Sequence, residues 1–152
     1  MRNTISIVIV ALAFVMTQCP DKKDMKQGLA GKVLWYEGNM MPKIKTSEND
    51  ELERGRPVQR QILVYKPITA QDCEGEGVLY DAVNGELVAS DSSNREGVFF
   101  IPLPEGKYSV LIKEGDQYFA SVMDGKGHLN PVEIKKDEIS RMKIEINYKA
   151  AY

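Results

Sequence analysis

The chain has 152 residues, and 20 Lys and Arg against 22 Asp and Glu give it a formal net charge of −2 at pH 7. One His and two Cys are too few for a zinc site or a disulfide framework, and no cofactor or metal is expected. The mild acidity and the absence of any run of Lys or Arg argue against nucleic acid as a partner.

The N-terminus has the features of a signal peptide over residues 1–18. One basic residue, Arg2, precedes an apolar run over residues 5–16. This run is shorter than the roughly 20 residues that span a bilayer. The alternative is a buried helix or strand of the fold, but the polar stretch PDKKDMKQG separates the run from everything downstream.

The stretch VMTQC at the end of the apolar run resembles the lipobox of bacterial lipoproteins, in which the Cys receives a diacylglycerol and becomes the first residue. It departs from that pattern at Met16 and Gln18. Each buried CH₂ of an acyl chain contributes about 0.8 kcal/mol, so lipidation of Cys19 would tether the protein to a membrane. The alternative is an ordinary signal peptide and a secreted or periplasmic protein, in which a Cys19–Cys73 disulfide is open.

A lipidated Cys19 leaves residues 19–28 as the lipidated Cys and a flexible stem, and residues 29–152 as a single domain. The Lys- and Asp-containing stem resembles surface-export signals of some Bacteroidetes lipoproteins. The expected location is the cell envelope, on the periplasmic or surface side of the outer membrane. The expected partners are the membrane, through the anchor, and an envelope protein or a polysaccharide.

Short alternating apolar runs recur along the mature chain between Gly, Pro, Asn and Asp, a spacing typical of a sandwich or a barrel. About eight or nine strands are predicted. They cover residues 31–38, 58–67, 77–83, 85–91, 97–103, 107–115, 117–125, 128–136 and 139–149.

Three local patterns refine this prediction. Asn84-Gly85 is a two-residue turn signal and predicts a hairpin of 77–83 with 85–91. Alternation in the last strand places Met142, Ile144, Ile146 and Tyr148 on its buried face. Pro131 is typical of an edge strand or a loop.

The long connection 37–56 is predicted to be a loop at one end of the sandwich. Met40 and Met41 are its apolar cluster, and we interpret them as a lid over the end of the core. The acidic run 47–53 is expected to be solvated.

The stretch NREGVFFIPLPEGKYSV, residues 94–110, combines a turn, a strand and an arch. Phe99, Ile101 and Leu103 share one face and are predicted core residues. Leu103, Gly106 and Tyr108 have the Leu-x-x-Gly-x-Tyr spacing of a tyrosine corner, in which the Tyr hydroxyl bonds back to the backbone across an arch between two sheets.

This segment resembles the central pattern of carboxypeptidase regulatory-like domains, also described as transthyretin-like or prealbumin-like β-sandwiches, as found in lipoproteins of the Bacteroidetes type. Ser90-Asp91, Gly97, Phe99 and 103–108 fit that pattern, whereas 70–84 does not fit and is interpreted as an insertion. The resemblance implies an all-β, Ig-like, Greek-key sandwich of about seven to nine strands and a non-catalytic accessory module. It supplies no functional residues.

Few residues point to chemistry. His128 lacks a recognisable nucleophile motif and is interpreted as a loop or strand-start residue. Glu114, Asp116 and Asp124 do not have the spacing of an EF-hand and are interpreted as solvated carboxylates. Cys73 is interpreted as incidental.

A candidate binding surface is predicted from the aromatic residues, because adjacent residues of a strand point to opposite faces and only one of each pair can be core. Its members are Trp35, Tyr36, Met40, Met41 and Tyr118.

The sequence therefore favours a non-catalytic envelope lipoprotein that binds or assembles with another envelope component. One alternative is a transthyretin-like hydrolase that uses His128 with nearby carboxylates as acid and base. Another is a purely structural spacer.

Overall fold

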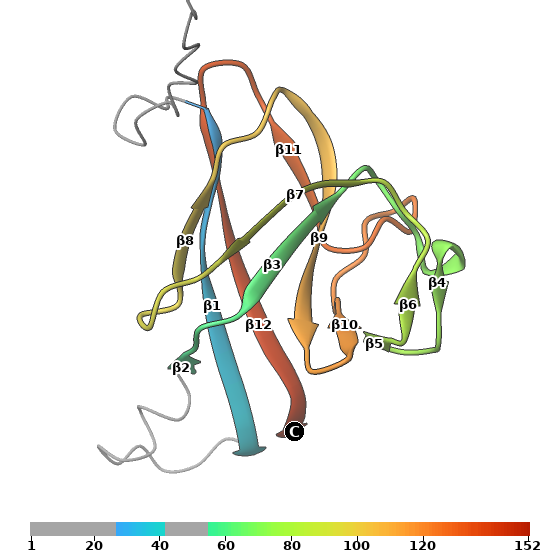
Figure 1. The fold of residues 1–152 in the computed structure, drawn as a ribbon. Helices are drawn as coiled ribbons and strands as arrows, with labels where there is room; N and C mark the ends of the chain where they lie inside the picture. Colours follow the sequence, from blue (N-terminus) through green and yellow to red (C-terminus); the bar gives the residue numbers. More distant parts are fainter. Residues whose placement is uncertain (1–26, 42–54) are drawn as a thin grey trace, which may run out of the picture.

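The computed structural model describes residues 27–41 and 55–152. The predicted signal peptide, Cys19, and most of the 37–56 loop lie outside the described residues. The described chain is almost entirely β-structure, and its one helical element is a single 3₁₀ turn, η2 (Ala70–Asp72). None of its elements is a helix that could cross a membrane. The prediction of an all-β sandwich is confirmed (Figure 1).

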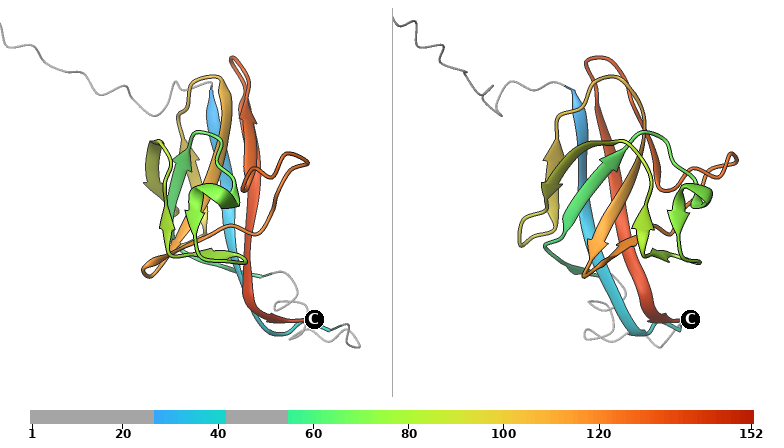
Figure 2. Two further views of the ribbon diagram at one scale, coloured as in Figure 1. Left: turned by 90° about the vertical axis from the view of Figure 1, so that its right-hand side faces the viewer. Right: turned by 45° about the vertical axis from the view of Figure 1, so that its right-hand side comes forward.

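The first sheet is built on two long strands that run parallel to each other. β1 (Gly28–Asn39) pairs with β12 (Ile139–Ala151) along nearly its whole length. The other edge of β1 takes β8 (Val98–Ile101) and β2 (Arg56–Pro57), both antiparallel. The two long strands lie side by side in every view (Figures 1 and 2).

The second sheet is antiparallel and packs against the first. Its strands, in spatial order, are β5 (Leu79–Tyr80), β10 (Gln117–Phe119), β9 (Gly106–Glu114), β3 (Gln61–Tyr65) and β7 (Leu87–Ser92). β11 (Pro131–Ile134) also pairs with β9. A separate two-stranded ribbon joins β4 (Cys73–Glu74) to β6 (Ala82–Val83).

The main core lies between the two sheets, where alternate residues of each strand meet. The predicted core residues Phe99, Ile101 and Leu103 are buried there. From β12, Ile144 and Ile146 are buried, while Met142 and Tyr148 pack against the same core, as their alternation predicts.

A second, smaller core covers the outer face of the second sheet. Leu63 and Leu111 point away from the main core, and Ile68, Tyr80 and Leu129 close over them. Strand alternation turns Leu111 away from Tyr108, Val110 and Ile112, and Leu111 is fully buried in the second core. The region 70–84 supplies much of the cover (Figure 2).

The predicted hairpin around Asn84-Gly85 is wrong. β6 pairs with β4, and β7 pairs with β3 in the second sheet. Gly85 does not adopt the positive φ that such a turn needs, and its Cα packs against Ile68, where an added Cβ would lie 2.8 Å from the side chain. Covering the second core therefore overrides the local turn signal.

Two predicted strands are shorter than expected, because the chain between them also helps to cover the second core. The run 117–125 is a strand only to Phe119, and 128–136 only over β11. The chain between them loops outward so that Leu129 enters the second core. Asn130, buried and with φ of 39°, holds this loop, since its Nδ2 donates to the Val110 carbonyl at 3.0 Å.

The arch between β8 and β9 has the contact of a tyrosine corner. The Tyr108 hydroxyl donates to the Pro104 carbonyl oxygen at 3.0 Å. Gly106 sits at φ +150°, which side chains rarely adopt, and an added Cβ would lie 3.4 Å from the Tyr108 hydroxyl. The arch links the first sheet to the second, as expected for this motif.

Candidate functional site

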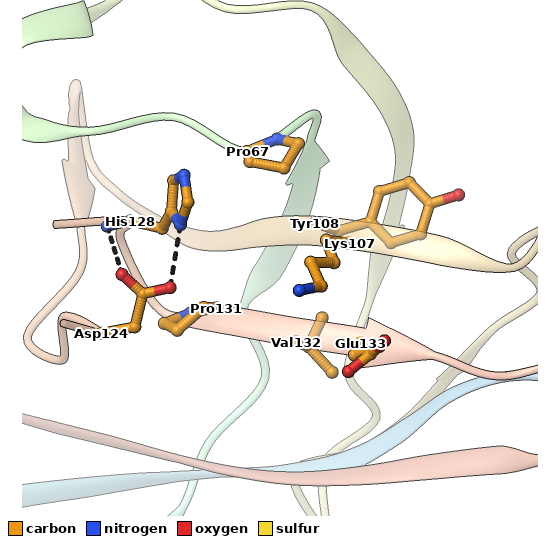
Figure 3. Close-up of a pocket in the computed structure, with 8 residues that line it drawn as sticks. All are labelled: Pro67, Lys107, Tyr108, Asp124, His128, Pro131, Val132 and Glu133. Atoms are coloured by element: carbon orange, nitrogen blue, oxygen red, sulfur yellow. Dashed lines mark hydrogen bonds and ion pairs between the residues drawn. The ribbon is translucent and has the colours of Figure 1, made fainter. Parts of the chain in front are cut away.

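A pocket of about 220 Å³ lies where β9, β11 and the loop before β11 meet (Figure 3). Its walls combine apolar and charged side chains. They are Pro67, Lys107, Tyr108, Asp124, His128, Pro131, Val132 and Glu133.

The antiparallel pairing of β9 with β11 positions one half of the pocket. Glu133 lies opposite Lys107, and Val132 lies opposite Tyr108. In the described part of the chain, neither Lys107 nor Glu133 takes part in an ion pair. Figure 3 shows the Lys107 ammonium group turned toward the His128 side of the pocket, and the Tyr108 hydroxyl turned away from it.

A tight turn from Asp124 to His128 forms the other half. The Asp124 Oδ1 atom accepts hydrogen bonds from the backbone N–H groups of Lys126 at 2.8 Å and His128 at 2.9 Å. Asp124 therefore holds the turn by its own side chain, as Asp does in many loops. The buried neighbour Leu129 donates its N–H to the Ile68 carbonyl at 2.9 Å and anchors the turn to the body of the protein.

Asp124 also orients the His128 ring. The distance from His128 Nδ1 to Asp124 Oδ2 is 2.8 Å. The hydrogen bonds from the His128 side chain and backbone lower the pKa of Asp124 from 3.8 to about 2. An ionised carboxylate only accepts hydrogen bonds, so Nδ1 is the donor and Nε2 is left for other contacts.

The pocket offers an oriented imidazole, but among its lining residues there is no Ser, Thr or Cys to act as a nucleophile. Within residues 27–41 and 55–152, no three His, Cys, Asp or Glu side chains gather so as to hold a metal ion. The site can therefore bind a ligand through mixed polar and apolar contacts. Covalent catalysis through a hydroxyl or thiol of Ser, Thr or Cys would need a group from outside the pocket.

The three carboxylates considered for calcium lie in different surroundings, and Asp116 is exposed. Glu114 is ion-paired with Arg60 and accepts a hydrogen bond from the Tyr148 hydroxyl at 3.0 Å. Its side chain is only 7% exposed, so the interpretation of Glu114 as a solvated carboxylate is wrong. Asp124 is bound to His128, as described above.

The aromatic members of the predicted binding surface are not brought together. Trp35 is 7% exposed and belongs to the main core, where it contacts Tyr148 edge-on with ring centroids 5.3 Å apart. Tyr36 lies on the outer face of the first sheet, and its hydroxyl donates to Glu145 at 3.2 Å. Tyr118 packs against the second core, with the Lys113 ammonium 3.7 Å from its ring centroid.

The two methionines lie at the far end of β1. The Met40 N–H donates to the Ala151 carbonyl at 2.7 Å, which extends the contact between β1 and β12. Met41 is 55% exposed, which does not fit a lid that closes the core. The predicted surface is thus divided among three faces of the molecule.

Sequence reasoning found His128 but missed most of its neighbours. The i, i+4 spacing of Asp124 and His128, with two Gly between them, is the local signal that would have paired these side chains. Lys107, Glu133 and Pro67 reach the pocket through long-range strand pairing, so no local pattern identifies them.

Comparison of the chain with protein-family models, with curated proteins and with solved structures gave no match in any of the three.

Proposed function

We propose that the protein is a non-catalytic, lipid-anchored envelope module with a transthyretin-like sandwich, and that its His128 pocket binds one sugar unit of an envelope polysaccharide. The observation that carries this proposal is the composition of the pocket. It joins apolar walls to charged groups that are free to bond a ligand, and its lining includes no Ser, Thr or Cys.

A sugar ring matches these walls. Its C–H faces would lie on Pro67, Pro131 and Val132. Its hydroxyl groups both donate and accept, so they can bond the Lys107 ammonium, the Glu133 carboxylate and the free His128 nitrogen. A volume of about 220 Å³ is below the roughly 300 Å³ at which pockets for drug-sized ligands begin, which suits a single small unit.

The binding test uses the ¹⁵N-labelled protein and a panel of hexoses, hexosamines and hexuronic acids. A ligand is expected to shift the amide signals of the 124–133 region. His128→Gln and Lys107→Gln should each weaken that shift at least severalfold, whereas Lys126→Ala, in the same turn but outside the pocket, should not. Absence of any shift across the panel would contradict the proposal and favour the structural spacer.

The anchor is tested separately. The N-terminal peptide of the protein recovered from membranes should begin at Cys19 and carry acyl chains by mass spectrometry. An unmodified N-terminus on a protein free of the membrane would contradict the lipid anchor, and a Cys19–Cys73 disulfide would then be sought.

The second candidate is a hydrolase, and the contact of 2.8 Å between His128 and Asp124 favours it. An Asp-oriented imidazole is a typical general base. This candidate predicts new reducing ends from a bound saccharide and their loss in His128→Ala. Binding alone predicts that the saccharide is recovered intact.

A further inference from the structure

The outer face of the first sheet carries a group of side chains that we call the basic patch. It consists of Ala30, Lys32, Val98, Phe100, Arg141 and Lys143. Strand register places Val98, Lys32 and Lys143 in one row across β8, β1 and β12, and Phe100, Ala30 and Arg141 in the next.

The cations of this patch are only partly neutralised by the protein. Lys32 lies directly opposite Lys143, and like charges at opposed positions are destabilising. Lys143 is ion-paired with Glu145. Across residues 27–41 and 55–152, Lys32 and Arg141 have no ion-pair partner. An external anion would relieve this repulsion.

Apolar side chains accompany these cations. Val98 is 45% exposed although it lies in a strand, and Phe100 is half-buried beside Ala30. A groove of about 520 Å³ runs past Lys32, Val98, Arg141 and Lys143. Exposed apolar groups among cations are typical of surfaces that enter the interface of an anionic membrane.

An acidic segment lies on the other side of the sandwich. Residues 70–86, which help to cover the outer face of the second sheet, contain five acidic residues and no Lys or Arg. The electrostatic field of these two regions would turn the basic patch toward an anionic surface and the acidic region away from it.

The chain enters the fold next to the patch. Gly28 begins β1 only two residues before Ala30, and Cys19 precedes Gly28 by nine residues. Nine extended residues span at most about 30 Å. If the proposed anchor exists, it holds this end of the first sheet close to the bilayer.

We propose that the basic patch docks the domain on the anionic lipid surface to which Cys19 anchors it. This orientation rests on the proposed lipid anchor. It would leave the second sheet with its acidic region facing away from the membrane. Each Lys or Arg near an anionic surface strengthens the contact roughly fivefold, so Lys32 and Arg141 together account for about 25-fold.

The test uses the full chain isolated from membranes and reconstituted in vesicles of phosphatidylcholine with or without 30% phosphatidylglycerol. The background variant Cys73→Ser removes the free thiol of Cys73. In this background, Val98→Cys is labelled with a fluorophore, and quenchers attached to the lipids reach this fluorophore only when position 98 lies at the membrane interface. Glu76→Cys, in the acidic region, is the matched probe site. We expect quenching at position 98 but not at 76, and only in the anionic vesicles.

Two changes should reverse this result. Lys32→Gln with Arg141→Gln should reduce the docked fraction, and 1 M salt, where the Debye length is about 3 Å, should abolish docking. Mass spectrometry of the N-terminal peptide reports the anchor independently. An acylated chain with no quenching at position 98 would overturn the docking alone. An unacylated chain would overturn the anchor, and quenching at position 98 would still decide whether this face binds anionic lipid.

Discussion

The Tyr108 hydroxyl makes one hydrogen bond in a nearly buried position, to the Pro104 carbonyl oxygen. Tyr108→Phe keeps the ring and removes only this bond, so we expect the free energy of unfolding to fall by about 1 to 1.5 kcal/mol. Urea denaturation would measure the change. Tyr152→Phe, at a residue that is 76% exposed, is the matched control and should have no measurable effect. Equal stability of the two variants would show that the corner hydrogen bond adds nothing.

Asp124 should retain its charge in acid. Its pKa in the folded protein is about 2, below the ordinary 3.8, because His128 donates hydrogen bonds to it. The contribution of Asp124 to stability is therefore complete above pH 3.8 and is lost as the pH falls through about 2. The amide signals of Lys126 and His128 should move with a midpoint near pH 2. Asp124→Asn should remove that transition, and a midpoint near 4 would contradict the assigned contact.

The first sheet depends on a close approach at Gly31 in β1. An added Cβ there would lie 2.5 Å from the Phe99 ring and would collide with the Met142 carbonyl oxygen. Gly31→Ala is expected to lower the free energy of unfolding by about 1 to 3 kcal/mol, since the strands on both sides must move. Gly125→Ala, which meets nothing within 4 Å and does not have a positive φ, is the control. Thermal or urea unfolding would compare the two variants.

Strand existence was predictable because it depends on alternation within a few residues. The alternation of Ile144 and Ile146 with charged neighbours, and the spacing of Leu103, Gly106 and Tyr108, are local patterns. Strand pairing was harder to predict. Asn84-Gly85 is a strong turn signal, yet β7 pairs with β3 because its hydrogen bonds and side chains are satisfied by a strand that precedes it by some 25 residues.

The contribution of the second core to the stability of the whole molecule can be tested by shortening one of its buried side chains. Leu129 is fully buried there, so Leu129→Ala should lower the free energy of unfolding by about 2 to 5 kcal/mol. Leu87→Ala removes the same atoms from a residue that is 51% exposed and should change stability by less than about 0.5 kcal/mol.

Cys73 reports on the same region without any added probe. It packs against the second core, and burial raises the pKa of its thiol above 9.0, with a smaller contribution from Asp72. A thiol reagent at pH 7.5 should therefore modify it slowly, because little thiolate is present. In Leu129→Ala the rate should rise, whereas in Leu87→Ala it should not. Equal rates in all three proteins would show that Leu129 does not close the second core over Cys73.

The candidate site and the basic patch combine contacts within one local turn with contacts that form only when distant strands pair. Only contacts of the first kind can be predicted from a short stretch of sequence. Asp124 and His128 are four residues apart, so their contact belongs to a local turn. Lys107 and Glu133 face each other only because β9 and β11 pair. The three cations of the basic patch come from two strands more than 100 residues apart, so a chain without any run of Lys or Arg still presents them together.

By itself, the sequence determined the all-β class, the inward faces of the long strands and the arch at Tyr108, because each depends on neighbours within one strand or turn. Only the tertiary structure decided that 70–84 covers a second core, that Trp35 is buried while Tyr36 and Tyr118 lie on separate faces, and which charges share a surface. These outcomes depend on which strands pair and stack. Pairing is selected by the apolar area that the whole chain can bury, which no short segment specifies.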